Sequence, residues 1–264
     1  MTRIKKLISD LLLVLGFSVR RTSGLNQTEM LARSGTLLKI LSSYPSTKNL
    51  TLGQSLEIVG NAKSQLGQDV LALAQIGVER AGFFVEFGAT NGLDLSNTYL
   101  LEKSFGWKGI LCEPGKEWHE DLNLNRSSSV DTRCVYSSTG ETIEFSETSI
   151  GELSTISSYL KSDANRMLRK KASSYLVETV TLEDLLLTHS APSYIDFLSI
   201  DTEGSEYEIL NAFDFSRYSF GLICVEHNFA NNRERIRQLL SANGYSQVLA
   251  EFSAFDDWYV GAKR

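Results

Sequence analysis

Residues 83–92 read FFVEFGATNG, and this short stretch decides the expected fold. An apolar run that ends at glycine is typical of a central parallel strand covered on both faces. Gly88 and Gly92 permit positive φ, so the turn can bend tightly and leave room for a ligand beside the backbone. The stretch therefore predicts a buried central strand of an α/β sheet, with a glycine turn at the carboxyl end of that strand.

The residues after this turn complete a strand–helix–strand unit. Asp94 or Ser96 can cap a helix that ends at Gly106. Residues 109–112 read GILC and predict the next strand, with Glu113 at its carboxyl end. A carboxylate there can accept hydrogen bonds from both hydroxyls of a ribose. This is the layout of a site for an adenosine-containing cofactor, although a tight turn without a ligand has the same outline.

The residues of the turn discriminate between cofactors. The nicotinamide fingerprint G-x-G-x-x-G is absent, because no third glycine follows Gly88 and Gly92 at the required position. Glu86 lies beside the turn, and a carboxylate there would repel a pyrophosphate. S-adenosylmethionine has a sulfonium and an ammonium but no phosphate, so the turn favours this cofactor.

Two later stretches predict parallel strands that also end in ionisable residues. Residues 194–200 read YIDFLSI, and residues 221–225 read GLICV. In open α/β sheets the ligand crevice lies outside the carboxyl ends of such strands, so we expect the residues at these ends to surround one site. Those residues are Glu86, Glu113, Asp201, Glu203, Glu226 and His227.

Four motifs in this order resemble those of the FkbM family of S-adenosylmethionine-dependent methyltransferases. The resemblance covers about residues 62–262 and implies the class I methyltransferase fold: a Rossmann-like seven-stranded sheet, its last strand antiparallel, with helices on both faces. It also implies O-methylation of a hydroxyl on a sugar, glycan or secondary metabolite. One departure from the general class I pattern is the lost middle glycine, replaced by Ala89-Thr90. The motifs are EFGATNG (86–92), CEP (112–114), IDTEGSE (200–206) and VEHN (225–228), with SQLGQD (64–69) and GY (244–245) beside them.

Together, the resemblance and the strand ends give the expected site. His227 is the expected base, because imidazole titrates near neutral pH and Glu226 or Asp201 could raise its basicity; alternatively, it is a polar residue that caps a strand end. Asp201 is the second expected catalytic residue. A less favoured alternative is a divalent cation held by Asp201, Glu203, Glu226 and His227. The expected cofactor-binding residues are Gln68, Glu86, Gly88, Ala89, Asn91, Gly92, Glu113 and Asp201.

Composition indicates a soluble, cytoplasmic enzyme with one main domain, which we expect over residues 62–264. The 264 residues are 42% hydrophobic and can bury a sizeable core, and the net charge of −6 disfavours nucleic acid as a partner. The expected partner is a small molecule or glycan that bears a hydroxyl. Cys112, Cys134 and Cys224 are odd in number and lack CxxC spacing, which predicts buried, reduced thiols.

Residues 1–61 predict a helical extension. Apolar residues recur at helical spacing over residues 4–17, and residues 1–21 carry five basic side chains against one acid, Asp10. The apolar run is shorter than the roughly 20 residues that span a bilayer, and Asp10 interrupts any signal-peptide core. Either this helix packs on the domain or a partner chain, or it makes peripheral contact with an anionic membrane surface.

Shorter patterns predict the remaining elements. They are a helix over 64–80, a third strand over 131–136, a hairpin arm over 141–145 and a substrate lid over 146–175, which is rich in serine and threonine. Two other functions stay open: a non-catalytic binding or scaffold protein that retains the fold, and, less favoured, a nucleotide-dependent oxidoreductase.

Overall fold

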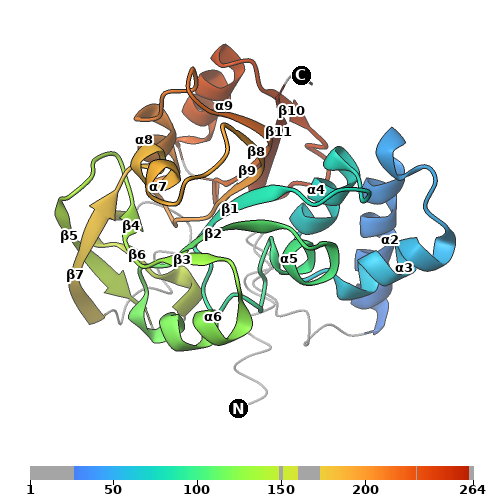
Figure 1. The fold of residues 1–264 in the computed structure, drawn as a ribbon, viewed down its shortest axis with the longest axis horizontal. Helices are drawn as coiled ribbons and strands as arrows, with labels where there is room; N and C mark the ends of the chain where they lie inside the picture. The colour runs from blue at the N-terminus through green and yellow to red at the C-terminus, as the bar shows by residue number, and fades with distance from the viewer. Residues whose placement is uncertain (1–26, 149–150, 160–172, 230, 262–264) are drawn as a thin grey trace.

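A seven-stranded sheet forms the centre of the computed structural model, which describes residues 27–148, 151–159, 173–229 and 231–261 (Figure 1). The strand order is β10-β11-β9-β8-β1-β2-β3. Neighbours are parallel except at β11, which is antiparallel to β9 and β10. The predicted sheet, with the last strand of the chain antiparallel, is confirmed. Its strands are β1 (Phe83–Phe87), β2 (Lys108–Cys112), β3 (Ser129–Asp131), β8 (Tyr194–Ile200), β9 (Ser219–Glu226), β10 (Ser246–Val248) and β11 (Asp256–Val260).

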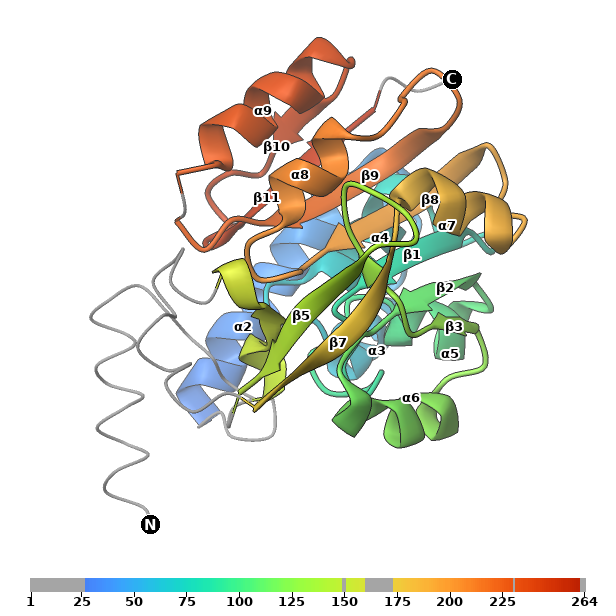
Figure 2. The same ribbon diagram turned by 90° about the vertical axis from the view of Figure 1, so that its left-hand side faces the viewer.

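Helices cover both faces of this sheet, because successive strand residues point to opposite sides. In β1, Val85 and Phe87 pack in one core, while Phe84 packs in the other. Figure 2 shows the sheet between the two helical layers. The first core includes α7 (Leu182–Thr188), α8 (Glu206–Asn211) and α9 (Arg233–Ala242). The second includes α2 (Gln27–Ser42), α3 (Leu52–Asn61), α4 (Gln68–Ile76), α5 (Tyr99–Phe105) and Leu122 of α6 (His119–Asn125).

The described part of the N-terminal extension is helical, as predicted. Thr51 caps α3 through a reciprocal capping box with Gln54, which explains where this helix begins. Leu37 of α2 and Ile58 of α3 belong to the same core as α4. The helices of the extension therefore pack on α4, which covers the main sheet, and a domain division at residue 61 stays a prediction. The amphipathic segment 4–17 lies outside the described residues.

A second, four-stranded sheet lies beside the main one, in the order β4-β7-β5-β6 (Figure 1). The predicted hairpin arm over 141–145 is confirmed as part of β5, which pairs antiparallel with β7. The predicted third strand over 131–136 is wrong in extent: β3 ends at Asp131, and the chain then enters the second sheet. The predicted helix over 64–80 is shorter and forms α4, and η4 (Gly151–Leu153) falls in the predicted lid. The second sheet consists of β4 (Cys134–Val135), β5 (Thr142–Glu147), β6 (Thr155–Ile156) and β7 (Ser173–Val180).

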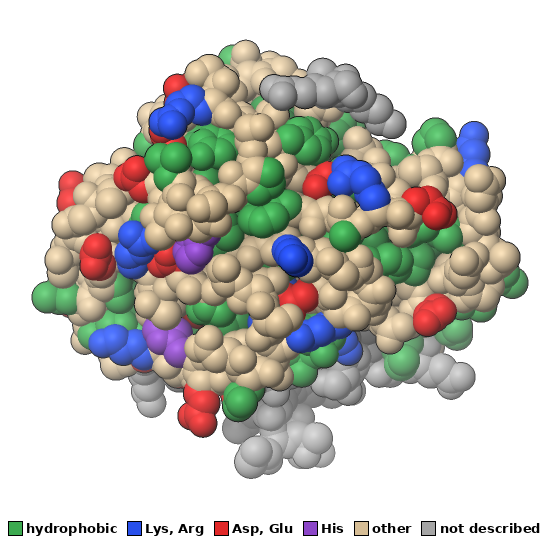
Figure 3. Space-filling view, viewed as in Figure 1, with side chains coloured by type: hydrophobic (Ala, Val, Ile, Leu, Met, Phe, Trp, Pro, Cys, Tyr) green, Lys and Arg blue, Asp and Glu red, His purple; other side chains and the backbone are tan. Residues whose placement is uncertain are grey.

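Charged side chains of both signs are scattered over the face drawn in Figure 3, with polar and apolar surface between them. This mixture differs from the continuous basic stripe of a nucleic-acid-binding surface. Within the described ranges, no helix is both long and apolar enough to cross a membrane. Cys112, Cys134 and Cys224 are buried and free of disulfides, as predicted.

Gly109 provides a test of how β1 and β2 fit together. A Cβ at this position would lie 2.3 Å from Cδ2 of Phe84, the residue paired with it on β1. We expect Gly109→Ala to lower the free energy of unfolding by roughly 1–3 kcal/mol, the usual cost of overpacking a core. Chemical denaturation measures this change.

The matched control is Gly60→Ala in α3, where a Cβ would meet nothing within 4 Å. Replacing a helical glycine by alanine reduces backbone freedom in the unfolded chain, so this variant should gain about 0.5–1 kcal/mol. Equal stability of the two variants would contradict the packing described for β1 and β2.

Candidate active site

A cavity opens where the carboxyl ends of the parallel strands meet the second sheet. Its volume, including the space at its open mouth, is about 1240 Å³. From the main sheet it is lined by Glu86, Gly88, Glu113, Asp201, Glu203 and Glu226, and from the second sheet by Cys134, Val135, Phe145 and Ile156.

The two glycines of the turn after β1 are required by protein contacts. A Cβ at Gly88 would lie 2.1 Å from the carbonyl oxygen of Asp201. A Cβ at Gly92 would lie 2.6 Å from side-chain atoms of both Arg126 and Leu122. Both glycines have positive φ, near 70°. Gly88 lines the cavity, whereas Gly92 does not, so the expectation that both glycines make room for a ligand holds at most for Gly88.

Glu86 is engaged within the protein. Its carboxylate accepts hydrogen bonds from the Asn97 backbone N–H at 2.7 Å and from the hydroxyls of Ser96 and Thr98. Arg126 Nη1 lies 3.6 Å from the same carboxylate. The guanidinium offsets the charge of Glu86, so this carboxylate would repel a pyrophosphate much less than the sequence alone suggests.

Glu113 joins the turns that follow β1 and β2. One carboxylate oxygen accepts the Thr90 N–H at 2.8 Å, and the other accepts the Gly115 N–H at 2.7 Å. Burial, and secondarily the charge of Asp201, raise the pKa of Glu113 to about 7. Each oxygen keeps a second lone pair, so this carboxylate can still accept hydrogen bonds from a ligand in the cavity.

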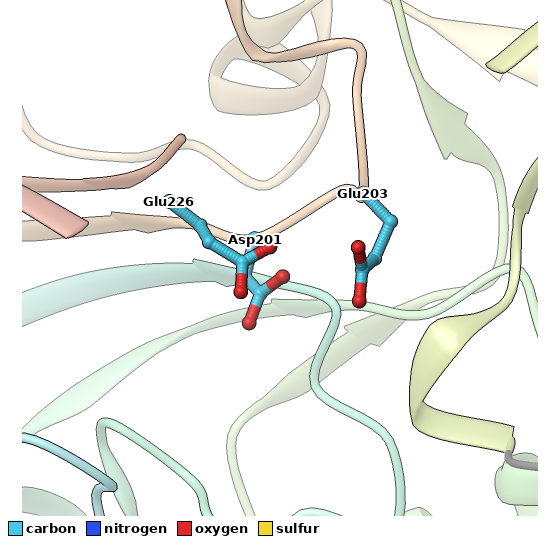
Figure 4. Close-up of side chains that lie close together, drawn as sticks. All are labelled: Asp201, Glu203 and Glu226. Atoms are coloured by element: carbon cyan, nitrogen blue, oxygen red, sulfur yellow. The ribbon is translucent and has the colours of Figure 1, made fainter. Parts of the chain in front are cut away.

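Three carboxylates, those of Asp201, Glu203 and Glu226, meet at the ends of β8 and β9 (Figure 4). One oxygen of each lies within 4.8 Å of the others. The Asn228 amide donates to Glu226 at 2.6 Å and to Glu203 at 3.0 Å. Burial and then the charges of Asp201 and Glu203 raise the pKa of Glu226 well above its usual range. Glu226 thus favours its protonated form and shares a hydrogen bond with Asp201.

His227 is not among the residues that line the cavity, although it was the expected base. Its Nε2 lies 3.0 Å from the Asp256 carbonyl oxygen, and its Nδ1 accepts the Phe229 N–H at 3.1 Å. This pattern places the proton on Nε2 and occupies both nitrogens. Burial is the main reason that the pKa of His227 is lowered. The geometry therefore opposes a base role, and it also separates His227 from the three carboxylates proposed as its fellow metal ligands.

Three of the expected cofactor-binding residues also lie behind the cavity wall. Gln68 donates to Asp256 at 2.6 Å and accepts from the Leu66 N–H. The Asn91 side chain accepts two backbone N–H groups of its own loop. Ala89 is buried. Gln68, Ala89 and Asn91 thus shape the site from outside, while Glu86, Gly88, Glu113 and Asp201 reach the cavity.

The wall formed by the second sheet was not predicted as a set of site residues. Phe145, Leu153 and Ile156 give this wall an apolar surface opposite the carboxylates. Thr155 of β6 donates its hydroxyl to the Glu203 carbonyl at 2.9 Å, which ties the second sheet to the loop after β8. The serine- and threonine-rich composition of 146–175 pointed to this region as a lid, but parts of it, 149–150 and 160–172, lie outside the described residues.

Strained backbone gathers around the cavity. Four of its lining residues are non-glycine residues with positive φ: Thr90, Leu95, Glu203 and Asn228, with φ between 40° and 62°. Such conformations are rare for these residue types and persist where the surrounding contacts fix them, most often at functional sites. Together with the buried acids, they make this cavity the candidate functional site of the fold.

Comparison with known proteins gives one family match. The family model described as the methyltransferase FkbM domain matches residues 86–246. These residues include Glu86, Glu113, Asp201 and Glu226, the acids at the strand ends that line the cavity. No curated protein matches the sequence significantly.

Solved structures similar to this chain include three named as methyltransferases or biosynthetic proteins. Methyltransferase FkbM from Methylobacillus flagellatus is 12% identical, with a TM-score of 0.43 over 88% of this chain and 60% of that one. Precorrin-6y C5,15-methyltransferase from Geobacter metallireducens is 9% identical, with a TM-score of 0.39 over 83% and 93%. The pyocyanin biosynthetic protein PhzM is 12% identical, with a TM-score of 0.36 over 89% and 63%. The chain thus spans 60% of the length of the Methylobacillus protein.

Glu206 supplies a pH-dependence prediction. Its carboxylate accepts hydrogen bonds from the N–H groups of Thr202 and Gly204. Burial is the main reason that the pKa of Glu206 is raised to about 7. The folded protein holds this proton more tightly than the unfolded chain, so stability falls as pH rises from about 4.5 to about 7. Glu113 and Asp256 have the same raised pKa and add to the fall.

Glu206→Gln keeps an oxygen acceptor for the Thr202 and Gly204 N–H groups and removes the titration. Between pH 4.5 and 8 this variant should lose less stability than the wild type, by up to about 3 kcal/mol. Urea denaturation at the two pH values measures the difference. Glu120→Gln, at an exposed position of α6, is the control and should match the wild type. Parallel pH profiles of wild type and Glu206→Gln would refute the buried titration.

Proposed function

The chain belongs to the methyltransferase FkbM domain family, and on that premise we propose that it transfers a methyl group from S-adenosylmethionine to a hydroxyl of a sugar, glycan or secondary metabolite. Membership of the family supports methyltransferase activity. The choice of donor and of a hydroxyl acceptor rests on the chemistry of the cavity.

Glu113 is the observation that carries the donor proposal. It lies at the carboxyl end of β2, next to the β1 turn, where an acidic residue can accept hydrogen bonds from both ribose hydroxyls of an adenosine. Backbone N–H groups of Thr90 and Gly115 fix its two oxygens, so no ordering of the side chain is needed on binding. The residues present therefore fit an adenosine-containing donor, and the missing third glycine of the nicotinamide fingerprint favours S-adenosylmethionine over NAD.

The donor supplies a methyl group on a positively charged sulfur. Transfer to a hydroxyl brings that charge together with a developing alkoxide, so the protein mainly has to align the reactants and exclude water. The apolar wall of Phe145, Leu153 and Ile156 provides the water-poor side of the cavity.

Asp201 replaces His227 as the proposed base. It lines the cavity at the end of β8, while the neighbouring Glu226 favours its protonated form and shares a hydrogen bond with it. That bond orients the Asp201 carboxylate at the cavity wall. We propose that Asp201 accepts the proton of the acceptor hydroxyl as the methyl group is transferred.

Two alternatives keep a place beside this proposal. The carboxylates of Asp201, Glu203 and Glu226 are hard oxygen ligands, the type that suits a divalent cation able to acidify a hydroxyl. Activity that survives exhaustive chelation would exclude this variant. A non-catalytic binding or scaffold protein that keeps the fold is the second alternative, and it predicts no turnover and binding of neither S-adenosylhomocysteine nor NAD.

Donor binding is tested by calorimetry with S-adenosylhomocysteine and with NAD. We expect the wild type to bind S-adenosylhomocysteine only, and Glu113→Ala to bind it roughly 10- to 100-fold more weakly, the loss expected when hydrogen bonds to a charged group are removed. Glu120→Ala, at an exposed position of α6, should bind like the wild type. Tight binding of NAD would favour an oxidoreductase, and binding of neither ligand would favour a scaffold.

The base is tested by comparing Asp201→Asn with His227→Gln. Turnover is followed as transfer of a labelled methyl group to metabolites and glycans extracted from cells that lack the gene. Asp201→Asn should lower kcat by roughly 100-fold or more, the contribution usual for a positioned base. His227→Gln should leave the pH profile of kcat unchanged, because neither ring nitrogen of His227 can take up a substrate proton. A profile that changes only in His227→Gln would reverse the assignment.

A further inference from the structure

Arg126 is a fully buried cation directly behind the cavity wall. It caps the end of α6, and its side chain is 0% exposed. It is not one of the cavity-lining residues. Its guanidinium stacks near the rings of Phe84 and Tyr99, at 5.4 and 5.9 Å from their centres. A cation buried this deeply is costly unless every donor finds a partner.

Those partners lie largely on one segment, the β1–α5 loop of residues 88–98. Arg126 Nη1 donates to the Gly92 carbonyl and to the Ser96 hydroxyl, each at 3.2 Å. Arg126 Nη2 donates to the Thr98 hydroxyl at 2.8 Å. Three positions spread along this loop therefore hydrogen-bond to one guanidinium. The same loop forms part of the cavity wall, through Gly88, Thr90, Asp94, Leu95, Ser96 and Asn97.

Carboxylates on two sides hold the guanidinium in place. Arg126 Nε donates to Glu102 of α5 at 3.0 Å, and Glu86 of β1 lies 3.6 Å from Nη1. Glu102 also accepts bonds from Ser127 and Ser128. Although burial would raise it, the Ser128 hydrogen bond and then the charge of Arg126 bring the pKa of Glu102 down to about 2. Glu102 thus stays ionised and keeps Arg126 aimed at the loop.

The fit is steric as well as electrostatic. A Cβ at Gly92 would lie 2.6 Å from Cγ of Arg126, so the loop passes against the arginine side chain with no room to spare. Thr90 and Leu95, on either side of Gly92, have strained positive φ. A strained loop relaxes unless surrounding contacts fix it, and the contacts of Arg126 are placed to do so.

We propose that Arg126 is a positioning residue that holds the β1–α5 loop in the shape that binds the methyl donor. This inference rests on the proposed function, since it takes the loop to be the donor-binding segment. The planar guanidinium is essential: its five donors form a rigid fork, and a lysine ammonium at one point cannot reach Gly92, Thr98 and Glu102 together. Arg126 acts through the loop and through Glu86, and does not touch the donor itself.

The test compares Arg126→Lys with Arg233→Lys. Arg233 also makes a two-point ion pair with a buried carboxylate, Asp257, at 2.8 Å for each bond, and neither residue lines the cavity. Both substitutions keep the positive charge and remove the planar guanidinium that makes several hydrogen bonds at once. Calorimetry with S-adenosylhomocysteine should show at least a roughly 10-fold higher Kd for Arg126→Lys and at most about a 2-fold change for Arg233→Lys.

Turnover and amide exchange separate positioning from simple loss of stability. In Arg126→Lys the KM for the donor should rise while kcat at saturating donor stays within about 3-fold. Hydrogen exchange of the amides of residues 90–98, measured without any ligand, should be roughly 10-fold faster than in the wild type and unchanged in Arg233→Lys.

The second variant is Glu102→Gln, which removes the negative charge that pairs with Arg126 Nε and changes no residue that lines the cavity. It should raise the Kd by about 3-fold or more, and less than additively with Arg126→Lys, because both act through one guanidinium. If Arg126→Lys does not fold, this variant decides the question. A folded variant with wild-type Kd and wild-type loop exchange would overturn the proposal. A wild type that binds no S-adenosylhomocysteine would instead refute the proposed donor, while the exchange data would still test the hold of Arg126 on the loop.

Discussion

Two turns approach one another so closely that no side chain fits between them, and the rest of the site depends on this contact. Phe87 pairs with Ile200, so the next residues, Gly88 and Asp201, meet where β1 and β8 end. On the other side, Phe87 pairs with Cys112, and Gly88 donates its N–H to the Cys112 carbonyl. The end of β1 is thus flanked by Asp201 and Glu113, which lie two strand spacings apart, roughly 10 Å. That separation suits a ligand with a ribose at one end and a reacting centre at the other.

The acids share this edge because of strand parity. Side chains alternate along a strand, and Phe84, Leu111 and Leu222 all pack in the core beneath α4 and α5. Glu86, Glu113 and Glu226 lie an even number of residues farther along their strands and therefore point to the same side. Burial raises the pKa of Glu113 to about 7 and that of Glu226 well above its usual range, and each shift lowers the stability of the fold near neutral pH. Arg126, behind the cavity wall, offsets the charge of Glu86, one of the acids that line the cavity.

Local patterns predicted β1, β2, β8 and β9 of the main sheet, while the number of strands and the antiparallel last strand came from the family resemblance. The apolar runs of β1, β8 and β9, each followed by an acid, specified parallel strands and the crevice at their ends, since burial on both faces leaves few other arrangements. The second sheet was harder, because β4 and β6 are two residues long and are defined by pairing with distant β7 and β5 rather than by their own sequence. Gln68 and Asn91 looked like ligand-binding residues because polar side chains in a motif are ambiguous: the same amide can contact a ligand or satisfy buried backbone, and tertiary contacts decide between them.

The sequence did not show which way His227 points. Glu226 ends β9, and the chain then turns, since Asn228 and Phe229 have positive φ of 40° and 56°, so strand alternation does not apply to His227. In the structure the imidazole bonds to the carbonyl of Asp256 on β11 and to the N–H of Phe229. Residue type favoured histidine as a base, but the tertiary contacts of this turn decide which side chains line the cavity. For an unfamiliar α/β sheet it follows that chemical suitability should be weighed only after the facing of each strand-end residue has been settled.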